Sequence, residues 1–327
     1  MGHDLRGASV VVTGASSGIG RATALAFARE GARLVVAART LDALREVAAA
    51  CERLGASAVP VETDVTVDAS VQRLATEAMR AHGSIDVWVN AAAILAMGRV
   101  DETPADVFRR VVDTNLMGCV HAAWAVLPVF REQRAGVLVN VASLDGKIAV
   151  PYASAYTASK HAVIGFSRSL RQELRLEGLR RVHVCLVNPT TVDTPLFQHA
   201  ANFTGARVRA LPPVYPPERV ARRIVRLARH PRREVFVGGA AHAMSVFWSV
   251  APRLAERFLT RYVDRGHLDR AASRSATSGN AFGPRPPAAL TGGWKPRGVA
   301  RAGRALAIGA PVLAAAALGA AWVARRT

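Results

Sequence analysis

Tyr156 and Lys160 are the two residues whose types and spacing most clearly indicate chemistry. They stand four positions apart in the run YTASK, at the start of a helical pattern. Residues at i and i+4 lie on one face of a helix, so the phenol and the amine are expected to point into the same space. An ammonium group nearby stabilises a phenolate and lowers its pKa from about 10. The pair is therefore predicted to act as a general acid and base.

Ser143 follows the apolar run 137–141, at the carboxyl end of a predicted strand. Ligands of open α/β sheets gather at that edge, so its hydroxyl is expected to hold a substrate carbonyl oxygen. Taken alone it would be interpreted as a serine in a turn. Tyr152 is given no such role, because its i+4 neighbour is Tyr156 rather than a lysine.

A glycine-rich turn directly follows the first predicted strand and opens a helical pattern. Glycines let the backbone approach a pyrophosphate closely, and the start of a helix offers free N–H groups and the positive end of its dipole. Ordinary turns also use glycines, but the position between strand and helix favours a dinucleotide site. Its predicted residues are Thr13, Gly14, Ser16, Ser17, Gly18, Ile19 and Gly20.

Arg39 comes directly after the second predicted strand. A carboxylate there would bind a ribose 2′-hydroxyl and repel a 2′-phosphate, whereas a guanidinium group suits a phosphate. We therefore expect NADP rather than NAD as the cofactor. The alternative is that Arg39 only lies at the protein surface.

Apolar, β-branched runs alternate with longer amphipathic stretches over residues 1–240. Near-continuous apolar strands are typical of a sheet that is covered on both faces. The alternation predicts an α/β fold, a Rossmann-like doubly wound parallel sheet in a single domain. The strands are expected at 10–13, 34–38, 58–61, 87–90, 137–141, 182–187 and 234–237, and the helices at 18–30, 41–54, 69–82, 105–134, 155–177 and 218–229.

These motifs occur in the order found in short-chain dehydrogenases/reductases, and the chain resembles that family over roughly residues 5–239. The turn at 13–20 matches the family's TGxxxGIG signature. The resemblance implies that Tyr156 is the general acid in reduction and the base in oxidation. It also implies that Lys160 binds the nicotinamide ribose, that Ser143 positions the carbonyl, and that Asn115 holds a water in a proton relay.

The resemblance implies further cofactor contacts. Asp64 and Val65 would border the adenine, and Asn90 with Ala91 would lie beside the cofactor ribose. Contacts to the nicotinamide would come from Pro189, Val192 and Thr194. The chain departs from the family's NNAG, which is NAAA at 90–93, and from its PG, which is PT at 189–190. Both departures affect the expected backbone path near the cofactor and leave the catalytic set unchanged.

The expected substrate is a hydrophobic alcohol or ketone, because substrate choice in this fold depends on loops beyond the sheet edge. The loop 195–213 and the segment 149–152 carry apolar residues, namely Leu196, Phe197, Phe203, Val208 and Leu211, with Ala149, Val150 and Tyr152. The family resemblance implies a homodimer or homotetramer paired through 105–134 and 155–177. The alternative function is a catalytically silent NADP-binding scaffold or redox sensor at a membrane, which would not need the complete catalytic set.

The pattern changes beyond residue 240. Residues 241–270 predict an amphipathic helical extension that packs on the core or lies on a membrane. Residues 271–304 are rich in Ser, Gly, Pro and Ala and predict a flexible linker. Residues 305–324 are uncharged and flanked by arginines, which predicts a transmembrane helix, with a soluble or disordered helix as the alternative. We expect a cytoplasmic catalytic domain with a C-terminal membrane anchor.

The charge and cysteine content narrow the function classes. The 327 residues carry a formal net charge of +19, and a basic tail suits an anionic membrane surface or nucleic acid. No recognition motif for nucleic acid is present, so nucleic-acid binding is not expected. The three cysteines are widely spaced and predict neither a disulfide framework nor a metal site. The charged N-terminus does not match a secretory signal.

Overall fold

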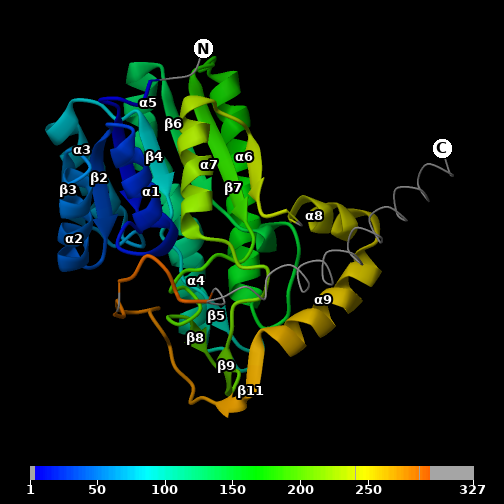
Figure 1. Ribbon diagram of the computed structural model, residues 1–327. Helices are drawn as coiled ribbons and strands as arrows, with labels where there is room; N and C mark the ends of the chain where they lie inside the picture. Colours follow the sequence, from blue (N-terminus) through cyan, green and yellow to red (C-terminus); the bar gives the residue numbers. More distant parts are fainter. Residues whose placement is uncertain (1–3, 240, 287, 295–327) are drawn as a thin grey trace, which may run out of the picture.

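A parallel seven-stranded sheet forms the centre of the protein, in the order β10-β7-β6-β4-β1-β2-β3. The computed structural model describes residues 4–239, 241–286 and 288–294 (Figure 1). The sheet confirms the predicted Rossmann-like fold. Its strands are β1 (Ser9–Thr13), β2 (Arg33–Ala38), β3 (Ala58–Glu62), β4 (Val87–Asn90), β6 (Gly136–Val141), β7 (Val182–Pro189) and β10 (Glu234–Val237).

Helices cover both faces of the sheet because neighbouring strand residues point to opposite sides. Val10 and Val12 of β1 belong to one buried cluster and Val11 to another. The first cluster packs under α1 (Gly18–Arg29), α2 (Leu41–Glu52) and α7 (Pro217–Arg229). The second packs under α3 (Asp68–His82), α5 (Gly118–Gln133) and α6 (Ser154–Leu176).

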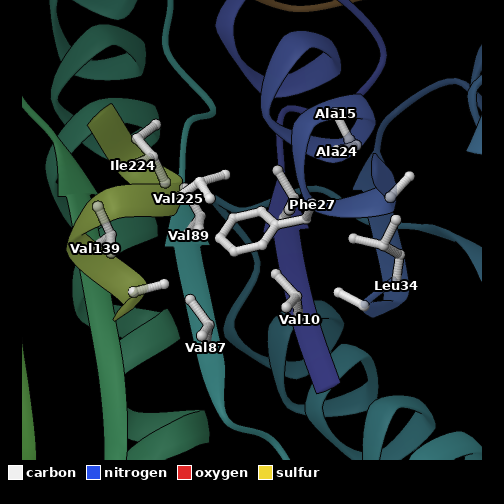
Figure 2. Close-up of a cluster of buried hydrophobic side chains, with 14 of the residues drawn as sticks. Val10, Ala15, Ala24, Phe27, Leu34, Val87, Val89, Val139, Ile224 and Val225 are labelled. Atoms are coloured by element: carbon white, nitrogen blue, oxygen red, sulfur yellow. The ribbon is translucent and has the colours of Figure 1, made fainter. Parts of the chain in front are cut away.

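Phe27 fixes α1 to the sheet. Its ring is fully buried and lies among the valines of β1 and β4 and Leu34 of β2 (Figure 2). Burying a phenylalanine side chain contributes about 1.5–3 kcal/mol. This packing therefore holds the start of α1, and the glycine-rich turn before it, in a fixed position at the carboxyl edge of the sheet.

The helix predicted at 105–134 is interrupted. It consists of α4 (Ala105–Val112), the π-helical turn η1 (Asp113–Met117) and α5. π-Helical turns occur frequently at functional sites. Asn115, one of the predicted catalytic residues, lies within this turn.

The segment beyond residue 240 folds back onto the domain. It forms α8 (Ala241–Val250), α9 (Pro252–Gly266) and β11 (Leu268–Ser273), which pairs antiparallel with β9 (Ala206–Val208). A second small sheet joins β5 (Ala96–Met97) to β8 (Ala201–Asn202). Composition predicts a flexible linker from residue 271, but β11 and the hydrogen bonds that residues 277–286 and 288–294 make with the domain give these residues a defined path. Its main-chain groups find partners that composition does not reveal.

No helix within the described part of the chain is long and apolar enough to cross a membrane. The predicted transmembrane helix, 305–324, lies outside the described residues and stays a prediction.

Candidate active site

A cavity of about 1200 Å³ lies at the carboxyl edge of the sheet, and most of the predicted site residues line it. It extends from the glycine-rich turn to the loops that follow β7. The predicted residues that line it are Gly14, Ser16, Ser17, Gly18, Ile19, Gly20, Arg39, Asp64, Val65, Ala91, Ser143, Tyr156, Lys160, Pro189, Val192 and Thr194.

The glycine-rich turn is shaped by close backbone contacts. Gly14 has φ +67°, and a Cβ there would lie 2.6 Å from the nitrogen of Ala92. A Cβ on Gly20 would overlap the carbonyl oxygen of Gly14. The N-cap residue Ser17 makes no side-chain capping bond, and the first amides of a helix have no partner within it. The turn therefore fits a pyrophosphate with its backbone close and with the amides after Gly18 as donors, while the Gly18 amide itself bonds to the Ala289 oxygen.

Arg39 lies where β2 ends and its side chain lines the cavity. Its guanidinium group donates hydrogen bonds to the main-chain oxygens of Asn280 (2.8 Å) and Ala281 (3.3 Å). The strand end carries no carboxylate, as the sequence indicated. The residue therefore lies at the cavity wall, bonded to a segment that sequence analysis did not connect with it.

Asp64, the nearest acidic group in this part of the cavity, is paired with other side chains. Burial tends to raise the pKa of Asp64, but hydrogen bonds from Thr66 and Arg110 hold that pKa below its ordinary value. The Arg110–Asp64 ion pair measures 2.7 Å. This carboxylate is therefore charged and neutralised by Arg110, so its repulsion of an anion near Arg39 is weak.

Tyr156 and Lys160 share one side of the cavity, as their spacing predicts. The Lys160 Nζ atom lies 5.5 Å from the centroid of the Tyr156 ring, and both side chains are buried. Lys160 also donates to the main-chain oxygen of Val141, at the end of β6, at 2.9 Å. Ser143 lies two residues after the end of β6, and its hydroxyl hydrogen-bonds with the phenol of Tyr156. The three side chains form one cluster.

The expected lowering of the Tyr156 pKa is wrong for this arrangement. Burial raises the pKa of Tyr156, the Asp145 carboxylate raises it further, and the hydrogen bond with Ser143 lowers it only in part. Burial also lowers the pKa of Lys160, to about 8. At neutral pH the tyrosine is therefore a protonated phenol beside a mostly protonated amine, which suits proton donation.

Asp145 is a functional candidate that sequence reasoning missed. It lies in the short 3-10 helix η2 (Leu144–Gly146), lines the cavity, and acts electrostatically on both Tyr156 and Lys160. Burial raises the pKa of Asp145 to about 6. Its position two residues after Ser143 was the available signal. The side chain is half-buried and lines the cavity, and above that pH its negative charge lies close to the positive charge of Lys160.

Thr13 and Asn90 do not line the cavity. The Thr13 hydroxyl donates to the Val89 main-chain oxygen at 3.4 Å and accepts from the Ala91 amide at 3.3 Å. The Asn90 side chain accepts from Trp88 and donates to Asn140, which lies opposite on β6. Both residues therefore brace the ends of the central strands.

Asn115 also lies outside the cavity wall. Its side-chain oxygen accepts from the Ile94 amide at 2.9 Å, and its nitrogen donates to the Ile94 oxygen and the Ser159 hydroxyl. Ser159 in turn donates to the Tyr156 main-chain oxygen. The side chain is fully buried and holds the loop after β4 against the helix that carries Tyr156.

Apolar side chains line the other end of the cavity. Of the predicted residues, Leu196, Phe197, Leu211 and Val150 line it, while Phe203, Val208, Ala149 and Tyr152 do not. The Tyr152 hydroxyl instead donates to Asp264 at 2.5 Å. Helices α8 and α9 add further walls that the sequence did not indicate, namely Ala243, Met244, Phe258, Leu259, Tyr262 and Val263.

Comparison with known proteins identifies the family. The family described as short chain dehydrogenase matches residues 8–204. The chain belongs to the short-chain dehydrogenase family. It is 36% identical over 256 residues to the uncharacterized oxidoreductase YxnA of Bacillus subtilis, covering 77% of this chain and 71% of that one. It is 32% identical over 269 residues to dehydrogenase/reductase SDR family member 7B of Bos taurus, covering 78% and 81%.

A solved structure shows the same fold. A short-chain dehydrogenase/reductase from Burkholderia phymatum in complex with NAD aligns with a TM-score of 0.69 and 28% identity. The alignment covers 78% of this chain and 97% of the other. Fold, cavity and family agree, so the protein is a nicotinamide-dependent oxidoreductase. The family match ends at residue 204, before α8, α9 and β11.

Replacing Asp145 with asparagine tests its effect on Tyr156. Removing the negative charge should lower the pKa of Tyr156, because Asp145 raises it. The alkaline limb of carbonyl reduction, which requires the protonated phenol, should move to lower pH by roughly one pH unit. Rates measured up to pH 12 would show this, because the pKa of the buried phenol lies above its ordinary value of about 10. Wild type and variant should agree at neutral pH and below, where the phenol is protonated in both.

Asp42→Asn is the matched control, because Asp42 lies exposed on α2 in an ion pair with Arg45. Its pH profile should equal that of the wild type. An unchanged alkaline limb in Asp145→Asn would show that this carboxylate does not act on the catalytic phenol.

Proposed function

We propose that the protein is an NADP-dependent oxidoreductase that interconverts a hydrophobic alcohol and the corresponding ketone or aldehyde, with Tyr156 as the general acid and base. The observation that carries the proposal is a single cavity. Its wall includes the glycine-rich turn at one end, the cluster of Ser143, Tyr156 and Lys160 in the middle, and apolar side chains at the other end.

The reaction needs a proton donor beside a bound carbonyl. When bound, a nicotinamide supplies the hydride in reduction and accepts it in oxidation. The Ser143 hydroxyl donates a hydrogen bond to the carbonyl oxygen and positions it next to the Tyr156 phenol. Tyr156 then gives its proton to that oxygen, and in oxidation its phenolate takes the alcohol proton. Lys160 would hold a ribose hydroxyl of the bound cofactor, and its ammonium group lies 5.5 Å from the Tyr156 ring centroid, where it favours the phenolate that forms during the reaction.

The cofactor choice follows from Arg39. A guanidinium group at the end of β2 pairs well with a 2′-phosphate, and no carboxylate on that strand end opposes it. The Arg110–Asp64 ion pair neutralises the nearest acidic group. These observations favour NADP over NAD.

The substrate class follows from the apolar end of the cavity. Leu196, Phe197 and Leu211 line this cavity together with side chains of α9 that include Phe258 and Leu259. Such walls bind an alkyl or ring system by removing its apolar surface from water. The hydrogen-bond donors Ser143 and Tyr156 line the same cavity beside these apolar walls, which fits a molecule with a single carbonyl on an apolar body.

A catalytically silent cofactor-binding scaffold or redox sensor is the second candidate. The described structure favours turnover, because Ser143, Tyr156 and Lys160 are all present and clustered in the cavity. A protein that only bound the cofactor would not need the phenol and the serine hydroxyl to meet.

We also propose that the protein is a homodimer or homotetramer that pairs through α4, α5 and α6, as the family resemblance implies. Trp124 on α5 is 55% exposed, which is unusual for a large aromatic side chain in an isolated domain. A mass of one chain in light scattering would contradict this pairing.

Tyr156→Phe should lower the kcat for NADPH-dependent carbonyl reduction by about 10²- to 10⁴-fold, because it removes the proton donor and keeps the ring. A panel of carbonyl compounds that ranges from short polar to long-chain and ring ketones measures the rate. NADPH binding should be retained. The larger apolar ketones should give the higher kcat/KM.

Tyr152→Phe is the matched control, since it removes a hydroxyl four residues earlier that bonds to Asp264 and does not line the cavity. Its rate should stay near that of the wild type. Equal rates for Tyr156→Phe and wild type would refute the mechanism, and NADPH binding without turnover on any carbonyl would favour the scaffold. A preference for short polar carbonyls would refute the substrate class.

Arg39→Ala should weaken NADPH binding by about 10- to 100-fold, the effect of losing charge-assisted hydrogen bonds to a phosphate. NADH binding should change much less, so the ratio of the two dissociation constants is the decisive quantity. Fluorescence titration measures both. Arg45→Ala, which removes an exposed arginine on the neighbouring helix, is the control. An unchanged ratio in Arg39→Ala would argue against a 2′-phosphate site.

A further inference from the structure

The described chain ends in an extended segment that crosses the dinucleotide side of the cavity. We call residues 276–286 and 288–294 the strap. It follows β11 and is tied to β8 by two main-chain hydrogen bonds between Asn202 and Thr277. From there it runs back toward the carboxyl edge of the sheet (Figure 1, orange). The strap lies beyond the residues that the family match covers.

The first contact of the strap is at the end of β2. The Arg39 guanidinium donates to the main-chain oxygens of Asn280 and Ala281, and the Nε atom of Arg110 donates to the Ala281 oxygen at 3.0 Å. Ala281 is 1% exposed. The strap is therefore fixed beside the arginine that we assign to the 2′-phosphate.

The second contact is at the start of α1. The Arg21 side chain donates to the Ala288 oxygen at 2.7 Å, and the main-chain nitrogen of Gly18 donates to the Ala289 oxygen at 3.0 Å. Gly18 belongs to the turn that we assign to the pyrophosphate. One strap carbonyl thus takes the first amide of the helix and leaves the following amides to a phosphate.

The third contact is after β7, beside the residues assigned to the nicotinamide. The buried carboxylate of Asp193 accepts hydrogen bonds from the main-chain nitrogens of Gly292 (3.0 Å) and Trp294 (2.9 Å). The indole nitrogen of Trp294 donates to the Thr194 oxygen at 3.1 Å, and its ring meets Phe197 edge-on. The strap therefore touches the predicted cofactor path at both ends and in the middle.

The strap covers the cavity without filling it. Side chains from both the strap and the glycine-rich turn line the same volume of about 1200 Å³, with Asn280, Pro284, Ala288 and Trp294 on the strap side. The Asn280 Oδ1 atom is buried and has no hydrogen-bond partner among the residues that the structure describes. A buried acceptor of this kind is costly unless it is paired, and an adenine amino group or a ribose hydroxyl would pair it.

We propose that the strap is the outer wall of the dinucleotide site, so that it closes over the bound cofactor and must lift before the cofactor can leave. The inference rests on the dinucleotide site proposed above. It assigns Asn280 as an additional adenosine contact and makes strap opening the step that limits cofactor release. Because the strap bonds mostly through main-chain groups, its own side chains can vary without loss of the contacts.

Gly292→Ala tests the proposal in the full chain. A Cβ at Gly292 would overlap the Thr194 oxygen and should lift the strap from the third contact. Release of NADPH, followed by stopped-flow fluorescence after displacement with excess NADP, should become about tenfold faster or more, since altered contacts act mainly on the dissociation rate. Gly283→Ala is the matched control, because a Cβ there meets no atom of the described residues within 4 Å, and its release rate should equal that of the wild type.

Two further measurements separate the outcomes. Hydrogen exchange of amides 288–294 in the wild type should slow when NADPH binds, and Asn280→Ala should weaken NADPH binding. An unchanged release rate in Gly292→Ala would overturn the strap as a barrier. A strap that competes with the cofactor would give a different result. Gly292→Ala would then bind NADPH more tightly, and NADPH would make the exchange of amides 288–294 in the wild type faster. That pair of results would overturn the proposal. If the wild type bound neither NADPH nor NADH, the dinucleotide site itself would be refuted.

Discussion

The close approach of the β1 turn to the loop after β4 is the constraint on which the rest of the site depends. Gly14 packs against the backbone of Ala92, and Gly20 packs against Gly14, with no room for a side chain at either position. This contact brings the start of α1 to the same sheet edge at which β4 and β6 end. Since Phe27 holds α1 on the sheet, the turn cannot move independently of the strands. The catalytic cluster after β6 is thereby placed at a fixed position relative to the phosphate turn.

The catalytic cluster is governed by the balance between burial and three charges. Burial favours the neutral forms of Tyr156, Lys160 and Asp145, and it shifts each pKa in the direction that removes charge. Asp145 and Lys160 oppose this shift in one another, because opposite charges stabilise each other. The pairing of Asp145 with Lys160 does not lower the pKa of the Tyr156 phenol, so the phenol stays protonated. A cluster of this kind holds its proton until a negative charge develops on a substrate oxygen beside it.

The sequence predicts the sheet and the catalytic pair because both depend on local periodicity. Apolar β-branched runs mark buried strands, and the i, i+4 spacing of Tyr156 and Lys160 places them on one helix face. It does not predict the pKa of Tyr156, because burial and the approach of Asp145 arise only from tertiary packing. The sequence does not predict the side-chain positions of Asn90 and Asn115 either. Both amides bond to groups from other elements, Asn140 of β6 and the main chain of Ile94, which a motif does not specify.

The strap escapes prediction for a different reason. Its composition of Ser, Gly, Pro and Ala is that of a linker, and the bonds that fix it come mostly from its main-chain oxygens and nitrogens. The pattern of side-chain types in a sequence does not reveal hydrogen bonds that main-chain groups make. The strap is held in place by the side chains that bond to it, namely Arg39, Arg21 and Asp193. The types of these residues do not predict that their partners are main-chain groups of the strap.

The core and the C-terminal extension beyond residue 240 therefore have different roles in the enzyme. The part that matches the family carries the proposed donors, acid–base group and phosphate turn, while residues of α9 and the strap line the cavity that these groups share. Hydride transfer benefits from exclusion of water, and electrostatic interactions strengthen in a dry site. The family core leaves its carboxyl edge open wherever loops do not cover it. In this protein the extension covers that edge from two sides, so enclosure of the reacting groups depends on residues that take no part in the chemistry.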